Sequence, residues 1–168
     1  MTQLIFLIGL PGSGKSSLAQ QLVSENQGHL LISTDAIRGQ LFGDEAIQGP
    51  WFLIWQQLQG QFSKAVLAIS QRQFETAIYD ATNAVCRQRR EAIALARETG
   101  FTQITGVWLD MPVWLCLARN RRRQRQVPDE VILRMHRQLR DSPPSVADGL
   151  DRLIRYSLGE ISTEIAIA

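Results

Sequence analysis

The segment Gly9-Leu-Pro-Gly-Ser-Gly-Lys-Ser-Ser17 decides the fold of this chain. Its first eight residues match the phosphate-loop pattern GxxxxGK(S/T). An apolar run, Leu4 to Ile8, precedes the loop, and apolar residues at helical spacing follow it between positions 18 and 23. The flanks therefore predict a strand that runs into the loop and a helix that leaves it.

The residue types in this loop suit a nucleoside triphosphate. The glycines allow backbone N–H groups to wrap a phosphate, because the turn needs positive φ and leaves no room for a Cβ. The N-terminus of the following helix points at the same phosphates. Lys15 is expected to reach the β- and γ-phosphate oxygens, and the Ser16 hydroxyl to bind Mg²⁺. The predicted nucleotide-binding residues of the loop are Gly9, Gly12, Ser13, Gly14, Lys15, Ser16 and Ser17.

Length and charge bound the possible folds and ligands. A chain of 168 residues fits one α/β domain, residues 1–168, with a full hydrophobic core. The net charge of +2 conceals an uneven distribution, because sixteen of the eighteen basic residues are Arg and eight of these fall between Arg119 and Arg140. Such a basic surface attracts phosphates, whether on a nucleotide or along a nucleic acid.

The cysteines and the N-terminal apolar run indicate a cytoplasmic protein. Cys86 and Cys116 lie far apart, with no CxxC pair and no His cluster, so the sequence suggests neither a zinc site nor a disulfide framework. The run from Leu4 to Ile8 is too short to cross a membrane, and we interpret it as a core strand. We expect no membrane partner.

Alternating apolar runs and helical periodicities predict an α/β order. Strands are expected at 4–8, 29–33, 74–80, 103–109 and 153–158, while 161–168 has no assignment. Helices are expected after the loop, through 36–41, from Trp51, over 87–98, from Pro112 and from Asp129. The long helix from Trp51 carries an apolar stripe that we interpret as core, made of Trp51, Trp55, Leu58, Phe62, Val66 and Ile69.

Asp35 follows the second predicted strand, at the sheet edge where open α/β folds bind ligands. In one interpretation it is the N-cap of the next helix, a role that Asp fills well. In the other it is a carboxylate near the phosphate loop that accepts a proton from an attacking hydroxyl. The two roles are compatible, and Arg38 lies one turn further along the same helix face.

Two further carboxylates end apolar strands. Asp80 ends the third strand and Asp110 follows the fourth. In phosphate-loop enzymes an Asp at such a position holds Mg²⁺ directly or through water. The sequence leaves the choice between Asp80 and Asp110 open.

The basic segment at 119–128 also has two interpretations. A run of charges is usually a solvated helix end. Its position between two predicted helices also suits a mobile lid over a nucleotide, and Arg can bind phosphate oxygens in pairs. We favour the lid.

Taken in order, these landmarks resemble the phosphate-loop kinases that include the 5′-hydroxyl kinase domain of phage polynucleotide kinase. The resemblance runs from Ile5 to about Asp151. It rests on the loop at 9–16, Asp35-Ala-Ile-Arg38, Asp80-Ala-Thr-Asn83, Leu109-Asp-Met-Pro112, Arg119-Asn120 with the basic residues after it, Val127-Pro128 and Asp148-Gly-Leu-Asp151.

The resemblance implies a three-layer fold, with a parallel sheet ordered 2-3-1-4-5 and helices on both faces. It also implies ATP, Mg²⁺ and transfer of the γ-phosphoryl group to a hydroxyl. The implied catalytic residues are Lys15, Asp35 as general base, and a lid arginine, Arg123 or its neighbour Arg122. The implied contacts are Arg119 to the nucleotide and Arg38, Asp80 and Asn83 to the substrate. For the metal, the residues themselves suggest Ser16 together with Asp80, with Asp110 as the alternative carboxylate.

Three functions remain open at this point. The first is a kinase for the 5′-hydroxyl of single-stranded RNA or DNA, and the second is a small-molecule kinase with the same machinery. The third is a nucleotide-controlled binding module. The sequence holds no Asn-Lys-x-Asp tetrapeptide for reading guanine, and a switch has little need of an Asp at the acceptor side.

Overall fold

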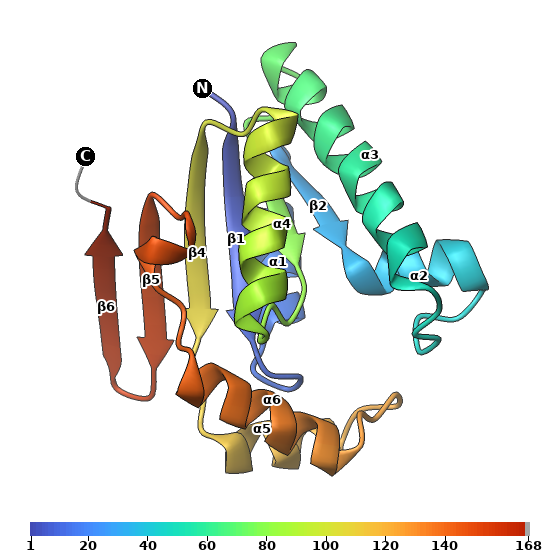
Figure 1. Cartoon of the computed structure of the whole chain (residues 1–168), viewed down its shortest axis with the longest axis vertical. Coiled ribbons are helices and arrows are strands. Elements are labelled where there is room, and N and C mark those ends of the chain that lie inside the picture. Colours follow the sequence, from blue (N-terminus) through green and yellow to red (C-terminus); the bar gives the residue numbers. More distant parts are fainter. Residues whose placement is uncertain (167–168) are drawn as a thin grey trace.

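One sheet runs through the structure, a computed structural model that describes residues 1–166 (Figure 1). Five strands lie parallel: β1 (Gln3–Gly9), β2 (His29–Ser33), β3 (Thr76–Asp80), β4 (Gln103–Leu109) and β5 (Arg152–Ser157). A sixth strand, β6 (Glu160–Ile165), pairs antiparallel with β5. The sheet order is β2-β3-β1-β4-β5-β6. The predicted order 2-3-1-4-5 is confirmed, and β6 extends it at the edge.

The sequence pattern did not reveal β6, because a strand of this kind lacks an apolar run. All six of its residues are exposed, and a tight turn at Gly159 (φ +85°) joins it to β5. The rest of the unassigned segment, residues 167–168, lies outside the described residues.

Within residues 1–166, six α-helices and a short 3₁₀ turn accompany the strands. They are α1 (Lys15–Glu25), α2 (Thr34–Phe42), α3 (Trp51–Ser70), α4 (Cys86–Thr99), α5 (Val113–Asn120), α6 (Asp129–Asp141) and η1 (Val146–Asp148). The helices predicted from Trp51 and from Asp129 begin at those residues, and the helix predicted from Pro112 begins at Val113.

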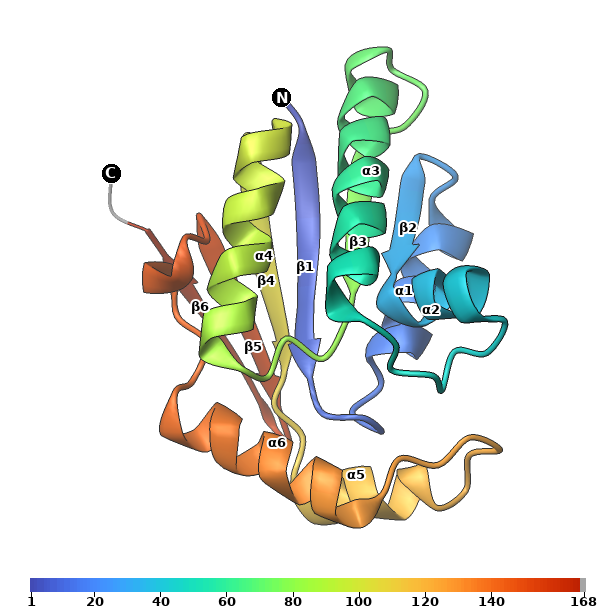
Figure 2. The same ribbon diagram turned by 45° about the vertical axis from the view of Figure 1, so that its right-hand side comes forward.

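Alternation along the central strand β1 divides the core into two layers. Leu4, Phe6 and Ile8 pack on one face of the sheet, with α3 and α4. Leu7 packs on the opposite face, against α1. Successive side chains of a strand point to opposite faces, so an almost uninterrupted apolar run builds both layers. Figure 2 shows α3 and α4 on the near side of the sheet, with β1 visible between them.

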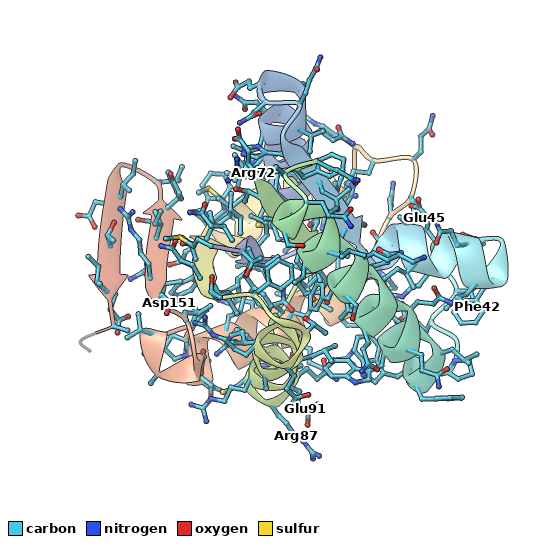
Figure 3. All side chains as sticks on the ribbon, turned by 90° about the horizontal axis from the view of Figure 1, so that it is seen from above. Phe42, Glu45, Arg72, Arg87, Glu91 and Asp151 are labelled. Carbon is cyan, nitrogen blue, oxygen red and sulfur yellow. The ribbon has the colours of Figure 1, made fainter. Side chains whose placement is uncertain are left out.

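Outside this core the helices carry polar faces. Arg87 and Glu91 project from the solvent side of α4, where their side chains form an ion pair at 2.8 Å (Figure 3). Within residues 1–166, no helix combines the length and the apolar character needed to cross a membrane.

The C-terminal ends of the parallel strands meet at one edge of the sheet. Helices α5 and α6 lie across this edge (Figure 2). The phosphate loop, the start of α2 and the segment after β3 come to the same edge. The fold therefore gathers the phosphate loop and the strand-end carboxylates where α/β sheets bind ligands.

Candidate active site

A cleft of about 800 Å³ opens at this edge. Its size is that of a typical small-molecule site. Eleven of the residues expected from the sequence line it: Gly12, Gly14, Lys15, Ser16, Ser17, Asp35, Arg38, Asp80, Asn83, Arg119 and Arg123. Of the two other predicted residues, Ser13 is buried beneath the loop, and Gly9 packs against it.

The phosphate loop is fitted closely to the protein behind it. A Cβ on Gly12 (φ +82°) would lie 2.4 Å from the carbonyl oxygen of Cys116, so a side chain there would displace backbone. The hydroxyl of Ser13 is buried with no hydrogen-bond partner among the described residues. Gly12 and Gly14 of the loop therefore line the cleft at the place where phosphates are expected, whereas the Ser13 hydroxyl is buried and is not among the lining residues described.

Lys15 opens α1 and is buried. Its Nζ donates a hydrogen bond to the carbonyl oxygen of Leu10, at 2.9 Å. Burial lowers the pKa of Lys15 to about 8, although the nearby Asp80 carboxylate opposes this shift and the Arg123 guanidinium adds to it. The side chain still carries its proton at neutral pH, and a phosphate is a natural partner for this poorly solvated ammonium.

Ser16 and Asp80 meet beside Lys15. The Ser16 hydroxyl donates to Oδ2 of Asp80 at 2.7 Å, although 64 residues separate them in the chain. A hydroxyl and a carboxylate are the hard oxygen ligands that Mg²⁺ prefers, and Mg²⁺ usually takes only one or two protein ligands. The Ser16–Asp80 pair therefore fits this ion.

Asp110, the other candidate carboxylate, has a different environment. Its Oδ2 accepts a hydrogen bond from Nε of Arg155 at 2.8 Å, and it lines a separate, smaller cavity. The geometry therefore favours Asp80 at the metal position.

Asp35 lies in the first turn of α2, facing the cleft. It does not cap the helix, as one interpretation expected, because Ser33 is the N-cap and its side chain accepts from the backbone N–H of Ala36. Oδ1 of Asp35 accepts from Nη1 of Arg38 at 2.9 Å and from Nη2 of Arg125 at 3.4 Å. The candidate base is thus free of a capping role and is held between two guanidinium groups.

Asn83 follows β3 in a left-handed conformation (φ +50°) and is buried. Its side-chain amide donates to the carbonyl oxygen of Leu7 at 2.7 Å, which ties the segment after β3 to β1. Asn83 lines the cleft, as a substrate-contacting residue must, and its hydrogen bond to Leu7 also gives it a structural role.

A buried ion cluster supports this segment from below, and the sequence analysis did not find it. The fully buried Arg89 donates to the carbonyl oxygen of Asn83 at 3.1 Å and to Oδ2 of Asp148 at 2.8 Å. Arg90 donates to Oδ1 of the same carboxylate at 2.7 Å. Burial alone would raise the pKa of Asp148, but these two guanidinium groups hold it below its ordinary value. One signal was present, because Asp148 belongs to a landmark of the resemblance.

The basic loop, which we define as residues 121–126, joins α5 to α6. Its two ends are fastened by the buried Asn120, whose amide donates to the Val127 carbonyl at 2.7 Å and accepts from the Val127 N–H at 3.0 Å. From this loop Arg123 and Arg125 reach the cleft, whereas Arg122 is not among the lining residues of the described chain. Of the two lid candidates, the geometry favours Arg123.

The interpretation of Trp51 as core is wrong. Trp51 is 41% exposed and lines the cleft, whereas Leu58, Phe62 and Ile69 of the same stripe are buried. The buried residues of α3 begin at Ile54, about one turn after Trp51, so the first residue of the stripe lies outside the core.

A phosphate loop bonded to a strand-end aspartate, on a sheet of this order, places the chain in the P-loop class of nucleotide-binding proteins. Within that class, residues 4–142 match the family model described as an AAA domain, and the chain belongs to this family.

Proteins similar to this chain include several kinases. It is 28% identical over 149 residues to the L-seryl-tRNA(Sec) kinase of Methanococcus maripaludis, and the match covers 83% of this chain and 53% of that protein. The chain thus spans about half the length of this curated relative.

Solved structures share the fold. A chain of the Pnkp1/Rnl/Hen1 RNA repair complex superposes with a TM-score of 0.66 at 23% identity, over 84% of this chain and 45% of that one. A sugar kinase from Janibacter sp. HTCC2649 superposes with a TM-score of 0.61 at 21% identity, over 95% and 87%. Both confirm the fold of the P-loop kinases.

Proposed function

We propose that this chain is an ATP-dependent kinase that transfers the γ-phosphoryl group to an alcohol, and that the acceptor is the 5′-hydroxyl of a polynucleotide. One observation carries the proposal. A single cleft brings the phosphate loop and the Ser16–Asp80 pair together with an uncapped carboxylate, Asp35, that faces the same space.

The residues of this cleft divide into three groups with different roles. Lys15 and the loop backbone hold the β- and γ-phosphates of ATP, with Arg119 beside the nucleotide. Ser16 and Asp80 hold Mg²⁺, which would neutralise charge on the phosphate oxygens. Arg123 acts from the basic loop, which together with its flanks at 119–128 forms a lid.

Transfer is an in-line displacement. The acceptor oxygen forms a bond to the γ-phosphorus while the bond from that phosphorus to the bridging oxygen of ADP breaks. Asp35 accepts the proton of the attacking hydroxyl, and Lys15 and Arg123 balance the charge that develops on the transferring group. Arg38 holds Asp35 at 2.9 Å and faces the acceptor.

The charge of the cleft supports a polynucleotide acceptor. Six basic side chains line it, Lys15, Arg38, Arg119, Arg123, Arg125 and Arg134, against two carboxylates, Asp35 and Asp80. This surplus exceeds what a nucleotide with bound Mg²⁺ requires and suits an acceptor that carries phosphates of its own. The tRNA kinase and the RNA repair complex among the similar proteins are consistent with this choice.

A small-molecule acceptor is the second candidate. The sugar kinase from Janibacter resembles this chain over nearly the full length of both proteins. Under either acceptor we propose that residues 1–168 act as one domain. We also propose a cytoplasmic setting, since Cys86 and Cys116 are both free thiols.

The test is transfer of labelled γ-phosphate from ATP and Mg²⁺ to RNA and DNA oligonucleotides with a 5′-hydroxyl, beside a panel of sugars and other small alcohols. Asp35→Asn should lower kcat by about 10²-fold to 10⁴-fold, because general-base catalysis contributes that much. ATP binding should stay nearly intact.

The matched control is Asp44→Asn. Asp44 accepts a hydrogen bond from the N–H of Ala46 in the loop after α2, so its loss should leave kcat unchanged. Equal activity of the Asp35 variant and wild type would remove Asp35 from the mechanism. Transfer to a sugar and to no oligonucleotide would replace the polynucleotide acceptor by the second candidate.

A further inference from the structure

Trp51 has an environment that the phosphate chemistry does not explain. It is the first residue of α3, it is 41% exposed, and it lines the cleft together with Arg38 and Gln48. Its neighbour Phe52 is 62% exposed and is not among the lining residues of the described chain. Single exposed aromatics are common on protein surfaces, so the position of Trp51 inside the cleft is what distinguishes it from Phe52.

The indole is supported from behind. The rings of Trp51 and Trp55 lie 6.2 Å apart at an angle of 45°. Trp55 is half-buried and packs against the main hydrophobic core. An aromatic ring held by a second ring loses little conformational freedom when a ligand stacks on it, so the side chain forms a preformed platform.

Trp51 belongs to the acceptor side of the cleft. Helices α2 and α3 pack against each other, so the start of α3 lies beside the helix that carries Asp35 and Arg38. Arg119, the residue expected at the nucleotide, comes instead from α5, which is not part of this helix pair. A ring stacked on Trp51 would therefore lie next to the group whose hydroxyl faces Asp35.

Arg38 adds a second indication of an unfilled contact. Its Nη1 is used by Asp35, and its Nε is buried without a hydrogen-bond partner among the described residues. Buried guanidinium nitrogens are normally paired. A polar ligand bound between Arg38 and Trp51 would complete this environment.

We propose that Trp51 is the stacking platform for the terminal base of an oligonucleotide acceptor, and that stacking directs the terminal 5′-hydroxyl toward Asp35. This inference rests on the polynucleotide acceptor proposed above. A base presents a flat π-face to the indole, and stacking of this kind tolerates every base. A sugar ring can also lie on an indole, but it does not use the basic surplus of the cleft.

The experiment compares two acceptors that differ only in the terminal base. One is an oligonucleotide with a normal 5′-terminal nucleotide, and the other carries an abasic 5′-terminal residue that keeps its sugar and hydroxyl. In wild type, removal of the base should raise the acceptor KM by about 5-fold to 150-fold, the range expected for one stacked base. Trp51→Ala should show the raised KM with the normal acceptor and no further penalty with the abasic one.

Three controls separate stacking from a damaged fold. The KM for ATP should be unchanged in Trp51→Ala, Trp51→Phe should keep part of the discrimination, and Phe52→Ala should behave as wild type. If wild type transfers phosphate but Trp51→Ala still prefers the normal acceptor by the wild-type factor, the stacking role is wrong and the polynucleotide kinase remains. If wild type transfers to neither oligonucleotide, both proposals are wrong.

Discussion

Under the proposed function the cleft has a phosphate end, beside the phosphate loop and the segment after β3, and an acceptor end, beside α2 and the start of α3. The two ends are built in different ways. At the phosphate end the contacts are buried and anchored to backbone: Lys15 bonds the Leu10 carbonyl, Asn83 bonds the Leu7 carbonyl, and Arg89 bonds the Asn83 carbonyl. At the acceptor end the lining consists of partly exposed side chains, chiefly Trp51 and Arg125.

This difference corresponds to two kinds of task. Triphosphate binding and phosphoryl transfer need a site whose donors are fixed before the reaction, because a fixed site avoids reorganisation at the transition state. Selection of an acceptor depends on side chains that can differ between proteins while the fold stays the same. We therefore expect mutations at the phosphate end to cost stability or binding steeply, and mutations at the acceptor end to change acceptor preference at little cost to the fold.

The largest expected effect is on the buried cluster beneath the phosphate end. Asp148→Asn should lower the free energy of unfolding by about 3–5 kcal/mol, because it leaves the fully buried guanidinium of Arg89 without a negative charge to pair with. Chemical denaturation measures this change. The pKa of Asp148 lies below its ordinary value of 3.8, so its stabilising contribution is present above about pH 4 and is lost as the pH falls further.

Asp141→Asn is the matched control for this prediction. Asp141 pairs with Arg140 at 3.8 Å, and its side chain is 72% exposed. An exposed pair contributes little, so this variant should unfold as wild type does. A loss below about 1 kcal/mol in Asp148→Asn would show that the cluster is not what fixes this end of the cleft.

The sequence also predicted correctly which side chains line the phosphate end, although their roles stay a prediction. The loop motif and the ends of apolar strands are local signals, and they led to Lys15, Ser16 and Asp80. The partners of these residues lie far away in the chain, so the choice of Asp80 over Asp110 required the fold. Arg89 gave no signal of its own, because an arginine in a basic helix is normally solvated.

At the acceptor end the same reasoning failed at particular residues. Helical periodicity placed Trp51 in the core, but periodicity does not tell where along a helix the packing begins. Asp35 follows a strand as an N-cap would, yet the helix begins at Thr34, two residues earlier than expected, with Ser33 as its cap. Arg125 could not be distinguished from the other arginines of the basic loop, because its contacts with Asp35 and Glu45 depend on how the loop crosses the cleft.

An intermediate effect is expected from pH at Lys15. The ammonium is the form that binds phosphate, and burial lowers its pKa to about 8 in the protein alone. The Kd for ATP should therefore rise about tenfold for each pH unit above 8. ATP affinity therefore falls with pH, whereas the free energy of unfolding should rise between pH 8 and 10.5. The cost of burying the ammonium is present below pH 8 and disappears as the pH rises toward 10.5, the ordinary pKa of lysine.

Lys64→Met is the control for this titration. Lys64 is exposed on α3, and it is the second of the two lysines in the chain. The variant should reproduce the wild-type profile in both ATP titrations and unfolding. A Kd for ATP that stays constant from pH 7 to 10 would mean that Lys15 does not titrate in this range.

The smallest expected effect distinguishes two arginines of one loop. Arg125 contacts Asp35 at 3.4 Å and Glu45 at 3.2 Å, and Glu45 lies beside the end of α2 (Figure 3). Arg121 pairs with Asp129 at 2.8 Å and is not among the cleft-lining residues described. Both pairs are solvent-exposed, so alanine at either position should change the free energy of unfolding by less than about 1 kcal/mol.

Their effects on transfer should differ. Arg125→Ala removes a cation from the acceptor end, so the acceptor KM should rise about fivefold, which corresponds to about 1 kcal/mol. The KM for ATP should stay the same, and Arg121→Ala should change neither value. Because a lost phosphate contact also weakens the salt dependence of acceptor binding, the Arg125 variant should respond less steeply to added salt than wild type. An equal response of both variants would assign the acceptor effect to the general charge of the loop and would remove Arg125 from the acceptor end.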